Sequence, residues 1–156
     1  MYKRQDQGWV STGGAYITKL EEQMAGFLHV EKVAACQSGT SALHLSLLEC
    51  NVQPGDMVIV PTLTFIAAVN PVHYQFAEPV FMDCDDSLCM DPVKLRKFCE
   101  KECHVEQKQL IHTASGKKIK AVIVVHVFGN LADMESIMDI ACLLYTSPSP
   151  RDRSLS

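Results

Sequence analysis

The fold class follows from residues 33–45, which read Val33-Ala34-Ala35-Cys36-Gln37-Ser38-Gly39-Thr40-Ser41-Ala42-Leu43-His44-Leu45. The short apolar run at the start predicts a buried strand over residues 32–36, and the leucine spacing at the end predicts a helix that continues to about residue 50. Ser38-Gly39-Thr40 is predicted to form the tight turn between them. A strand, a tight turn and a helix in this order are the unit from which α/β folds are built.

The Ser38-Gly39-Thr40 turn has the chemistry to bind a phosphate group. At a helix N-terminus several backbone N–H groups and the positive end of the helix dipole point at one spot. Gly39 would let a ligand approach the backbone closely, and the Ser38 and Thr40 hydroxyls can cap the helix or donate to an anion. On these three residues alone an ordinary helix cap is the commoner explanation, since capping residues open most helices.

Apolar runs alternate with helical patterns along the rest of the chain. Strands are predicted over residues 57–60, 79–82 and 119–125, and helices over residues 15–28, 66–74, 92–103 and 133–141. Residues 105–118 are polar and rich in turn formers, so they are predicted to be a loop. Strands and helices that alternate with short connections imply right-handed βαβ units and a largely parallel sheet. The helix over residues 15–28 is amphipathic, and its expected inward side chains are Tyr16, Leu20, Met24 and Phe27 or Leu28.

Further motifs share the order and spacing of a known family. They are Gly8-Trp9-Val10-Ser11-Thr12-Gly13-Gly14, Cys36-Gln37-Ser38-Gly39-Thr40-Ser41-Ala42-Leu43, Gln53-Pro54-Gly55-Asp56, residues 61–70 and Pro79-Val80-Phe81-Met82-Asp83. Together they resemble the amino-terminal part of the DegT or StrS sugar aminotransferases, which use pyridoxal 5'-phosphate (PLP). Residues 116–122 and 126–130 resemble the branch that acts on nucleotide-linked keto sugars in legionaminic-acid-type pathways.

The resemblance runs from about residue 8 to residue 141 and implies a fold. Residues 1–141 would be the N-terminal part of the large domain of an aspartate-aminotransferase-like enzyme. This domain is a three-layer α/β structure of PLP fold type I with a mainly parallel sheet. The family is typically dimeric with active sites at the subunit interface, so a homodimer is expected for the intact enzyme.

The same resemblance implies the binding residues. It assigns Ser38-Gly39-Thr40 to the phosphate of PLP and Phe65 to stacking on the pyridine ring, and it places Thr12 and Gly13 against the substrate. Without the resemblance Phe65 would be expected in the core, since most Phe residues are buried.

The implied reaction moves an amino group from an amino-acid donor, glutamate, to the keto carbon of a nucleotide-linked sugar, in cell-surface polysaccharide or nonulosonic acid biosynthesis. In the family the Schiff-base lysine and the aspartate that pairs with the ring nitrogen lie beyond the position of Ala141. No catalytic residue is therefore assigned, and the fragment is expected to be inactive. Two alternatives stay open: a non-catalytic phosphate- or nucleotide-binding α/β module, and a PLP-dependent sugar dehydratase of the same family in which histidine replaces the lysine.

Residues 142–156 are predicted not to belong to the domain. Residues 142–152 match, over eleven consecutive codons, the translation of a DNA sequence that resembles a transposase-type sequencing-library adapter. We therefore expect residues 142–156 to be an artefact of sequence assembly.

Composition excludes several classes of partner. The net charge of −4 comes with no basic stripe, so nucleic acid is not expected as a partner. No apolar run reaches the length of a membrane span and the first residues lack the apolar core of a signal peptide, so we expect a cytoplasmic protein without a membrane partner. The seven cysteines are expected to be free thiols in a reducing compartment.

No metal site is predicted either. Cys99, Cys103 and His104 lack the paired spacing of a zinc site, and the two cysteines, four residues apart on a helix, are expected to pack as small apolar groups. The acidic run over residues 83–86 is expected to be a solvated turn.

Overall fold

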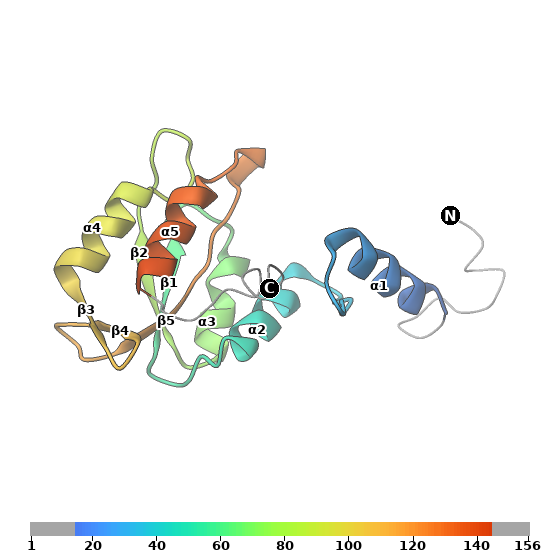
Figure 1. Ribbon diagram of the computed structural model, residues 1–156, viewed down its shortest axis with the longest axis horizontal. Coiled ribbons are helices and arrows are strands. Elements are labelled where there is room, and N and C mark those ends of the chain that lie inside the picture. Colours follow the sequence, from blue (N-terminus) through green and yellow to red (C-terminus); the bar gives the residue numbers. More distant parts are fainter. Residues whose placement is uncertain (1–14, 145–156) are drawn as a thin grey trace. The chain divides into compact units, whose positions relative to one another are not determined.

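The computed structural model describes residues 15–144, and the chain divides into two compact units at the bond between Ser38 and Gly39 (Figure 1). The described part of the first unit contains one helix, α1 (Ala15–Leu28), with the bounds that the sequence predicts. None of its residues is buried, so the predicted inward packing of the apolar stripe is wrong for this unit. Within residues 15–38 the helix is followed by an extended segment, which offers no second apolar face for it to pack against.

The predicted strand over residues 32–36 does not form. These residues belong to no strand, and apart from the half-buried Val33 they are exposed. The backbone N–H of Ala35 donates to Glu21 Oε1 of α1, at 2.9 Å, instead of to a strand partner. Two alanines add little apolar area and have low β-propensity, so the run depends on a neighbouring strand, and residues 15–38 do not provide one.

The second unit is built on a five-stranded sheet in the order β2-β1-β5-β4-β3 (Figure 1). Its strands are β1 (Met57–Pro61), β2 (Glu78–Met82), β3 (Cys103–Glu106), β4 (Gln109–His112) and β5 (Lys118–Val122). Strand β1 pairs in parallel with both β2 and β5, whereas β4 pairs antiparallel with β3 and with β5. The parallel core of the sheet confirms the predicted α/β architecture.

The hairpin of β3 and β4 corrects the predicted loop over residues 105–118. Its two-residue turn is Gln107-Lys108, and both residues have positive φ, 48° and 62°. Two-residue hairpin turns of this hand usually carry Asn or Gly, so Gln-Lys gives no hairpin signal in the sequence. Strand β5 also ends at Val122 instead of residue 125.

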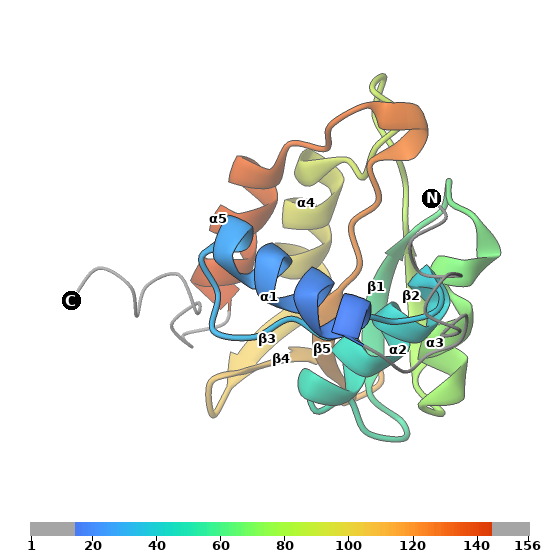
Figure 2. The same ribbon diagram turned by 90° about the vertical axis from the view of Figure 1, so that its right-hand side faces the viewer.

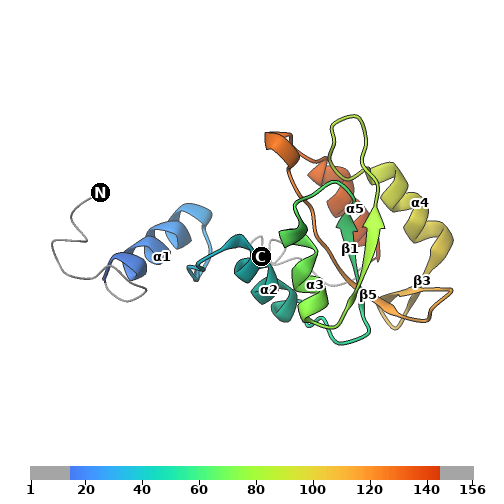
Figure 3. The same ribbon diagram turned by 180° about the vertical axis from the view of Figure 1, so that it is seen from behind.

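Helices cover both faces of the sheet (Figures 2 and 3). One face carries α2 (Gly39–Glu49), the short 3₁₀ helix η1 (Ile66–Ala68) and α3 (Asn70–Tyr74), and the other carries α4 (Pro92–Glu102) and α5 (Met134–Leu144). Strand β1 is buried on both sides. Val58 and Val60 belong to the core under α2 and α3, whereas Ile59 belongs to the core under α4 and α5. This alternation confirms the three-layer architecture.

Local chemistry sets the helix limits. Asp91 caps α4, because its Oδ1 accepts from the backbone N–H groups of Val93 (2.8 Å) and Lys94 (3.2 Å), as the Asp-Pro start predicts. The helix predicted over residues 66–74 is divided into η1 and α3 at Val69, shortly before Pro71, which has no N–H to donate. Helix α5 continues past residue 141 to Leu144, so it enters the segment predicted to be an artefact. None of the described helices is long and apolar enough to cross a membrane.

On the side of β4, strand β5 is paired over only part of its length, and this leads to a prediction. Strand β4 pairs only with Lys118 and Ile119, so the rest of β5 has β1 as its one strand partner within the described chain. Because open sheet edges template further pairing, we expect the purified chain to self-associate and to bind a hydrophobic dye. Size-exclusion chromatography and dye fluorescence would test this. A monomeric chain that unfolds cooperatively and binds no dye would contradict it.

Candidate active site at the carboxyl edge of the sheet

The parallel strands bring three loops to one edge of the sheet. Strands β2, β1 and β5 run in the same direction side by side, so the segments that follow them, residues 83–91, 62–65 and 123–133, leave from their carboxyl ends. Helix α2 runs down to the amino end of β1 through a short connection, and its N-terminus therefore lies toward the carboxyl edge (Figure 3). Ligands of open α/β sheets bind at this edge.

The start of α2 is open to a ligand. The helix begins at Gly39, which confirms the predicted helix N-terminus, although the described residues just before it, 29–38, form no strand. A Cβ built on Gly39 would meet no heavy atom within 4 Å, so the backbone there is accessible. Thr40 is half-buried and shares the inward stripe of α2 with Leu43 and Leu47. The N–H groups of a first helical turn have no intrahelical acceptor, so Gly39 and Thr40 offer donors to an anion.

Ser38 is the last residue of the first unit, and its predicted contact with the phosphate stays a prediction. Thr12 and Gly13, the predicted substrate-binding residues, lie outside the described residues.

Phe65 presents its ring to solvent at the carboxyl edge. Its side chain is 80% exposed, so Phe65 does not pack in the core. The loop that carries it is fixed at its start, because the Thr62 backbone N–H donates to the carbonyl oxygen of Met82 at 2.9 Å. An exposed aromatic ring on an anchored loop suits stacking on a flat ligand. The assignment of that ligand as the pyridine ring stays a prediction.

The lysine at the carboxyl edge, Lys94, is ion-paired. Lys94 Nζ lies 2.6 Å from Asp83 Oδ2 and also donates to the carbonyl oxygen of Cys84. The hydrogen bond to Asp83 raises the pKa of Lys94, and the same bond lowers the pKa of Asp83. A nucleophilic lysine needs a lowered pKa, usually through burial. Asp56 and Gln75 are the buried polar residues of the described chain, so none of its lysines has such a site.

The cysteine pair and the acidic turn have structural partners. Cys99 is a buried residue of α4, and burial, followed by the neighbouring Cys103, raises its pKa to about 12. Burial also raises the pKa of Cys103 to about 11. Both thiols therefore stay protonated and pack as small apolar groups, as predicted. The two cysteines do not share a helix, however, because α4 ends at Glu102 and Cys103 is the first residue of β3. The acidic turn is closed by Asp85, whose Oδ1 accepts from the backbone N–H of Ser87 at 2.8 Å. Within residues 15–144 no three His, Cys, Asp or Glu side chains converge as metal ligands.

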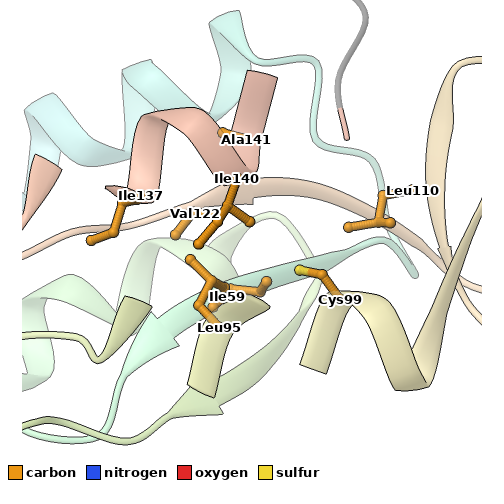
Figure 4. A pocket seen from close by; sticks show the side chains of 8 residues that line it. All are labelled: Ile59, Leu95, Cys99, Leu110, Val122, Ile137, Ile140 and Ala141. Atoms are coloured by element: carbon orange, nitrogen blue, oxygen red, sulfur yellow. The ribbon is translucent and has the colours of Figure 1, made fainter. Parts of the chain in front are cut away.

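A small cavity between the sheet and α4 and α5 is not a ligand site (Figure 4). Its volume is about 10 Å³, and its lining residues are Ile59, Leu95, Cys99, Leu110, Val122, Ile137, Ile140 and Ala141. The space is too small for more than a water molecule, and the lining is apolar, so it is a packing gap of the core.

One contact set at this edge is not predictable from residue patterns. In the loop after β5, the His126 ring accepts a hydrogen bond from the Ala132 backbone N–H, and Asn130 bonds to the loop after β2. They are the first and last residues of the motif over residues 126–130. The sequence offers no periodic signal for these contacts, because they depend on the fold of an irregular loop.

Solved structures identify the class of protein to which this fold and edge belong. An aminotransferase of the DegT, DnrJ, EryC1 and StrS type from Brucella abortus matches with a TM-score of 0.74 and 32% identity, over 89% of this chain and 35% of that chain. The PLP form of a sugar aminotransferase described as putative, from Streptococcus pneumoniae, matches with a TM-score of 0.69 and 25% identity, over 97% and 36%. These are PLP-dependent aminotransferases of fold type I, which confirms the fold prediction.

The family follows from the sequence itself. The profile of the DegT/DnrJ/EryC1/StrS aminotransferase family matches residues 2–143, and the chain belongs to this family. PLP is the cofactor of the family. A GDP-perosamine synthase from Escherichia coli O157:H7 is 39% identical over 87% of this chain and 33% of its own length. A UDP-N-acetyl-3-dehydro-alpha-D-glucosamine 3-aminotransferase from Acidithiobacillus ferrooxidans is 40% identical over 78% and 29%. The chain therefore spans about a third of the length of these relatives.

Proposed function

We propose that the chain is the N-terminal part of the large domain of a PLP-dependent aminotransferase that transfers an amino group from glutamate to a nucleotide-linked keto sugar. The observation that carries the proposal is the open N-terminus of α2 at Gly39, at the same sheet edge as the exposed ring of Phe65. A phosphate acceptor and a stacking face at one edge suit a phosphorylated aromatic cofactor.

Each of these residues has a defined role in the proposal. Gly39 and Thr40 hold the cofactor phosphate through backbone N–H groups and the Thr40 hydroxyl, and Ser38 adds its own hydroxyl. Phe65 keeps the ring in one plane by stacking. PLP, when bound, supplies the electron sink for the transfer of the amino group.

The substrate class rests on the relatives. Their names place a GDP-linked and a UDP-linked sugar among the compounds that they make or use, so a nucleotide-linked sugar is the class we propose for the intact enzyme. The legionaminic-acid-type branch, contact of Thr12 and Gly13 with the sugar, a homodimer and a cytoplasmic location are parts of the same proposal. A dehydratase with this fold is 22% identical to the chain, which shows the shared fold alone.

The domain assignment is also a proposal. Residues 1–141 belong to the large domain, and residues 142–156 derive from an adapter. Amplifying the gene and sequencing it past codon 141 tests this directly. If genomic DNA to which no sequencing adapter has been added contains codons 142–156, the adapter origin is wrong.

The phosphate site can be tested through Gly39. The Gly39→Val change places a branched side chain in the open space at the start of α2, and we expect binding of PLP to weaken about tenfold, the effect of losing roughly one hydrogen bond to a charged group. The measurement is a fluorescence titration with PLP. Gly26→Val is the matched control, because Gly26 also has open space around it but lies in α1. Equal affinities for the two variants would contradict the phosphate site.

A further inference from the structure

The loop after β5 has an unusual backbone. It contains the short 3₁₀ helix η2 (Val127–Gly129), within which Phe128 has φ 54° and ψ 23°, in the left-handed region. Gly129 follows with φ 84°. Bulky residues rarely adopt this conformation, and they keep it only where the surrounding structure holds them.

Two hydrogen bonds at Asn130 hold one end of this loop. The Asn130 side-chain Nδ2 donates to the carbonyl oxygen of Ser87 at 2.9 Å, and the Cys89 thiol donates to the carbonyl oxygen of Asn130 at 3.4 Å. The loop after β5 is thereby tied to the loop after β2. Since β1 lies between these strands, the tie spans the edge from which the Phe65 loop also leaves.

His126 closes the other end of the loop and has one ring nitrogen left. The backbone N–H of Ala132 donates to His126 Nδ1 at 3.1 Å, which requires a lone pair on Nδ1. A neutral ring in this contact therefore carries its hydrogen on Nε2. The side chain is exposed, and no acceptor for Nε2 is found within residues 15–144.

We propose that His126 has two functions at the candidate site: Nδ1 fixes the 126–132 loop, and the Nε2–H group donates a hydrogen bond to a phosphate oxygen of the bound ligand. This inference rests on the proposed function. Two kinds of hydrogen-bond donor lie at the carboxyl edge: the N–H groups in the first turn of α2 and the Nε2–H group of His126. Both require an oxygen acceptor. The oxygen belongs either to the phosphate of PLP or to the diphosphate of the nucleotide sugar, which are the same chemistry from two sources.

Two substitutions separate the functions of the ring. His126→Asn keeps an acceptor at the position of Nδ1 and removes the donor at Nε2, whereas His126→Gln keeps a donor near Nε2 and removes the acceptor at Nδ1. Dissociation constants for inorganic phosphate, PLP and UDP, together with the melting temperature, are measured for both variants and for the unchanged chain. The tautomer is read from the ¹⁵N shifts of the His126 ring in chain labelled at histidine.

The expected results follow from this design. His126→Asn melts as the unchanged chain does but binds one of the phosphate ligands about tenfold more weakly, the effect of one charge-assisted hydrogen bond. His126→Gln melts at a lower temperature. Weakened binding of PLP alone assigns the oxygen to the cofactor, and weakened binding of UDP alone assigns it to the sugar nucleotide.

Two results would overturn the inference without touching the proposed function: unchanged affinities in His126→Asn, or a ring that carries its hydrogen on Nδ1. If the unchanged chain binds neither PLP nor UDP, the proposed function fails and the inference fails with it.

Discussion

No sustained turnover is expected when the 156-residue chain is incubated with PLP, glutamate and a nucleotide-linked 4-keto sugar. Amino transfer requires a lysine that bonds covalently to the cofactor and moves protons. The described lysines are not buried, and Lys94, at the carboxyl edge, is paired with Asp83, which raises its pKa and keeps it protonated. On the proposed function we therefore expect the chain to make only noncovalent contacts with PLP, without a nucleophile.

The matching experiment extends the chain with the native continuation of its gene, and we expect activity to appear in the longer protein. The assay follows the amino sugar by mass spectrometry and the cofactor by its absorbance. Sustained turnover by the 156-residue chain, with stoichiometric covalent cofactor, would show that one of its own lysines is catalytic and that the site is placed wrongly.

Truncation of Ile59 is expected to have the largest effect on stability. Ile59 is 1% exposed in the middle of β1 and packs against residues of α4 and α5 (Figure 4). Ile59→Ala removes buried carbon atoms beside an existing gap, and such changes cost about 2–5 kcal/mol of the free energy of unfolding. Since domains of this size have only about 5–15 kcal/mol in total, much of the stability is expected to be lost. Urea unfolding followed by circular dichroism gives the value.

Val93→Ala serves as the control for this change. Val93 lies on α4 and is 73% exposed, so its truncation removes little buried area and is expected to change the free energy of unfolding by less than about 0.5 kcal/mol. Equal losses for the two variants would mean that the second unit does not unfold around β1.

The parts of the fold that local chemistry specifies could be predicted from the sequence. Helix α1, the capped start of α4 at Asp91, the end of β1 at Pro61 and the Gly39 helix start have signals that depend on neighbouring residues alone. The predicted strand over residues 32–36 failed because a strand is stable only with a partner, and a partner is a nonlocal fact. The predicted loop over residues 105–118 was wrong because the Gln107-Lys108 turn of the hairpin lacks the residues that mark such turns in a sequence.

The candidate site likewise has a part that could be predicted from local sequence and a part that could not. Motif spacing indicated residues that the structure places at the carboxyl edge, Gly39, Thr40 and Phe65. The contacts of His126 and Asn130 could not be predicted. The Asn130 side chain bonds to the loop after β2, far away in the chain, and the contact of His126 with Ala132 depends on how the irregular loop after β5 folds. Sequence patterns report periodicity within an element, whereas these bonds depend on where separate elements end.

The burial of β1 on both faces also determines how much sequence variation this region tolerates. At Val58, Ile59 and Val60 the side chains are 0–1% exposed, and alternate positions face different cores, so neither face offers room for a polar or larger residue. Phe81 of the edge strand β2 is 56% exposed and Val105 of β3 is 51% exposed. In a saturation library selected for folding, we expect β1 to accept almost nothing but its present aliphatic residues. Positions 81 and 105 are expected to accept many different side chains.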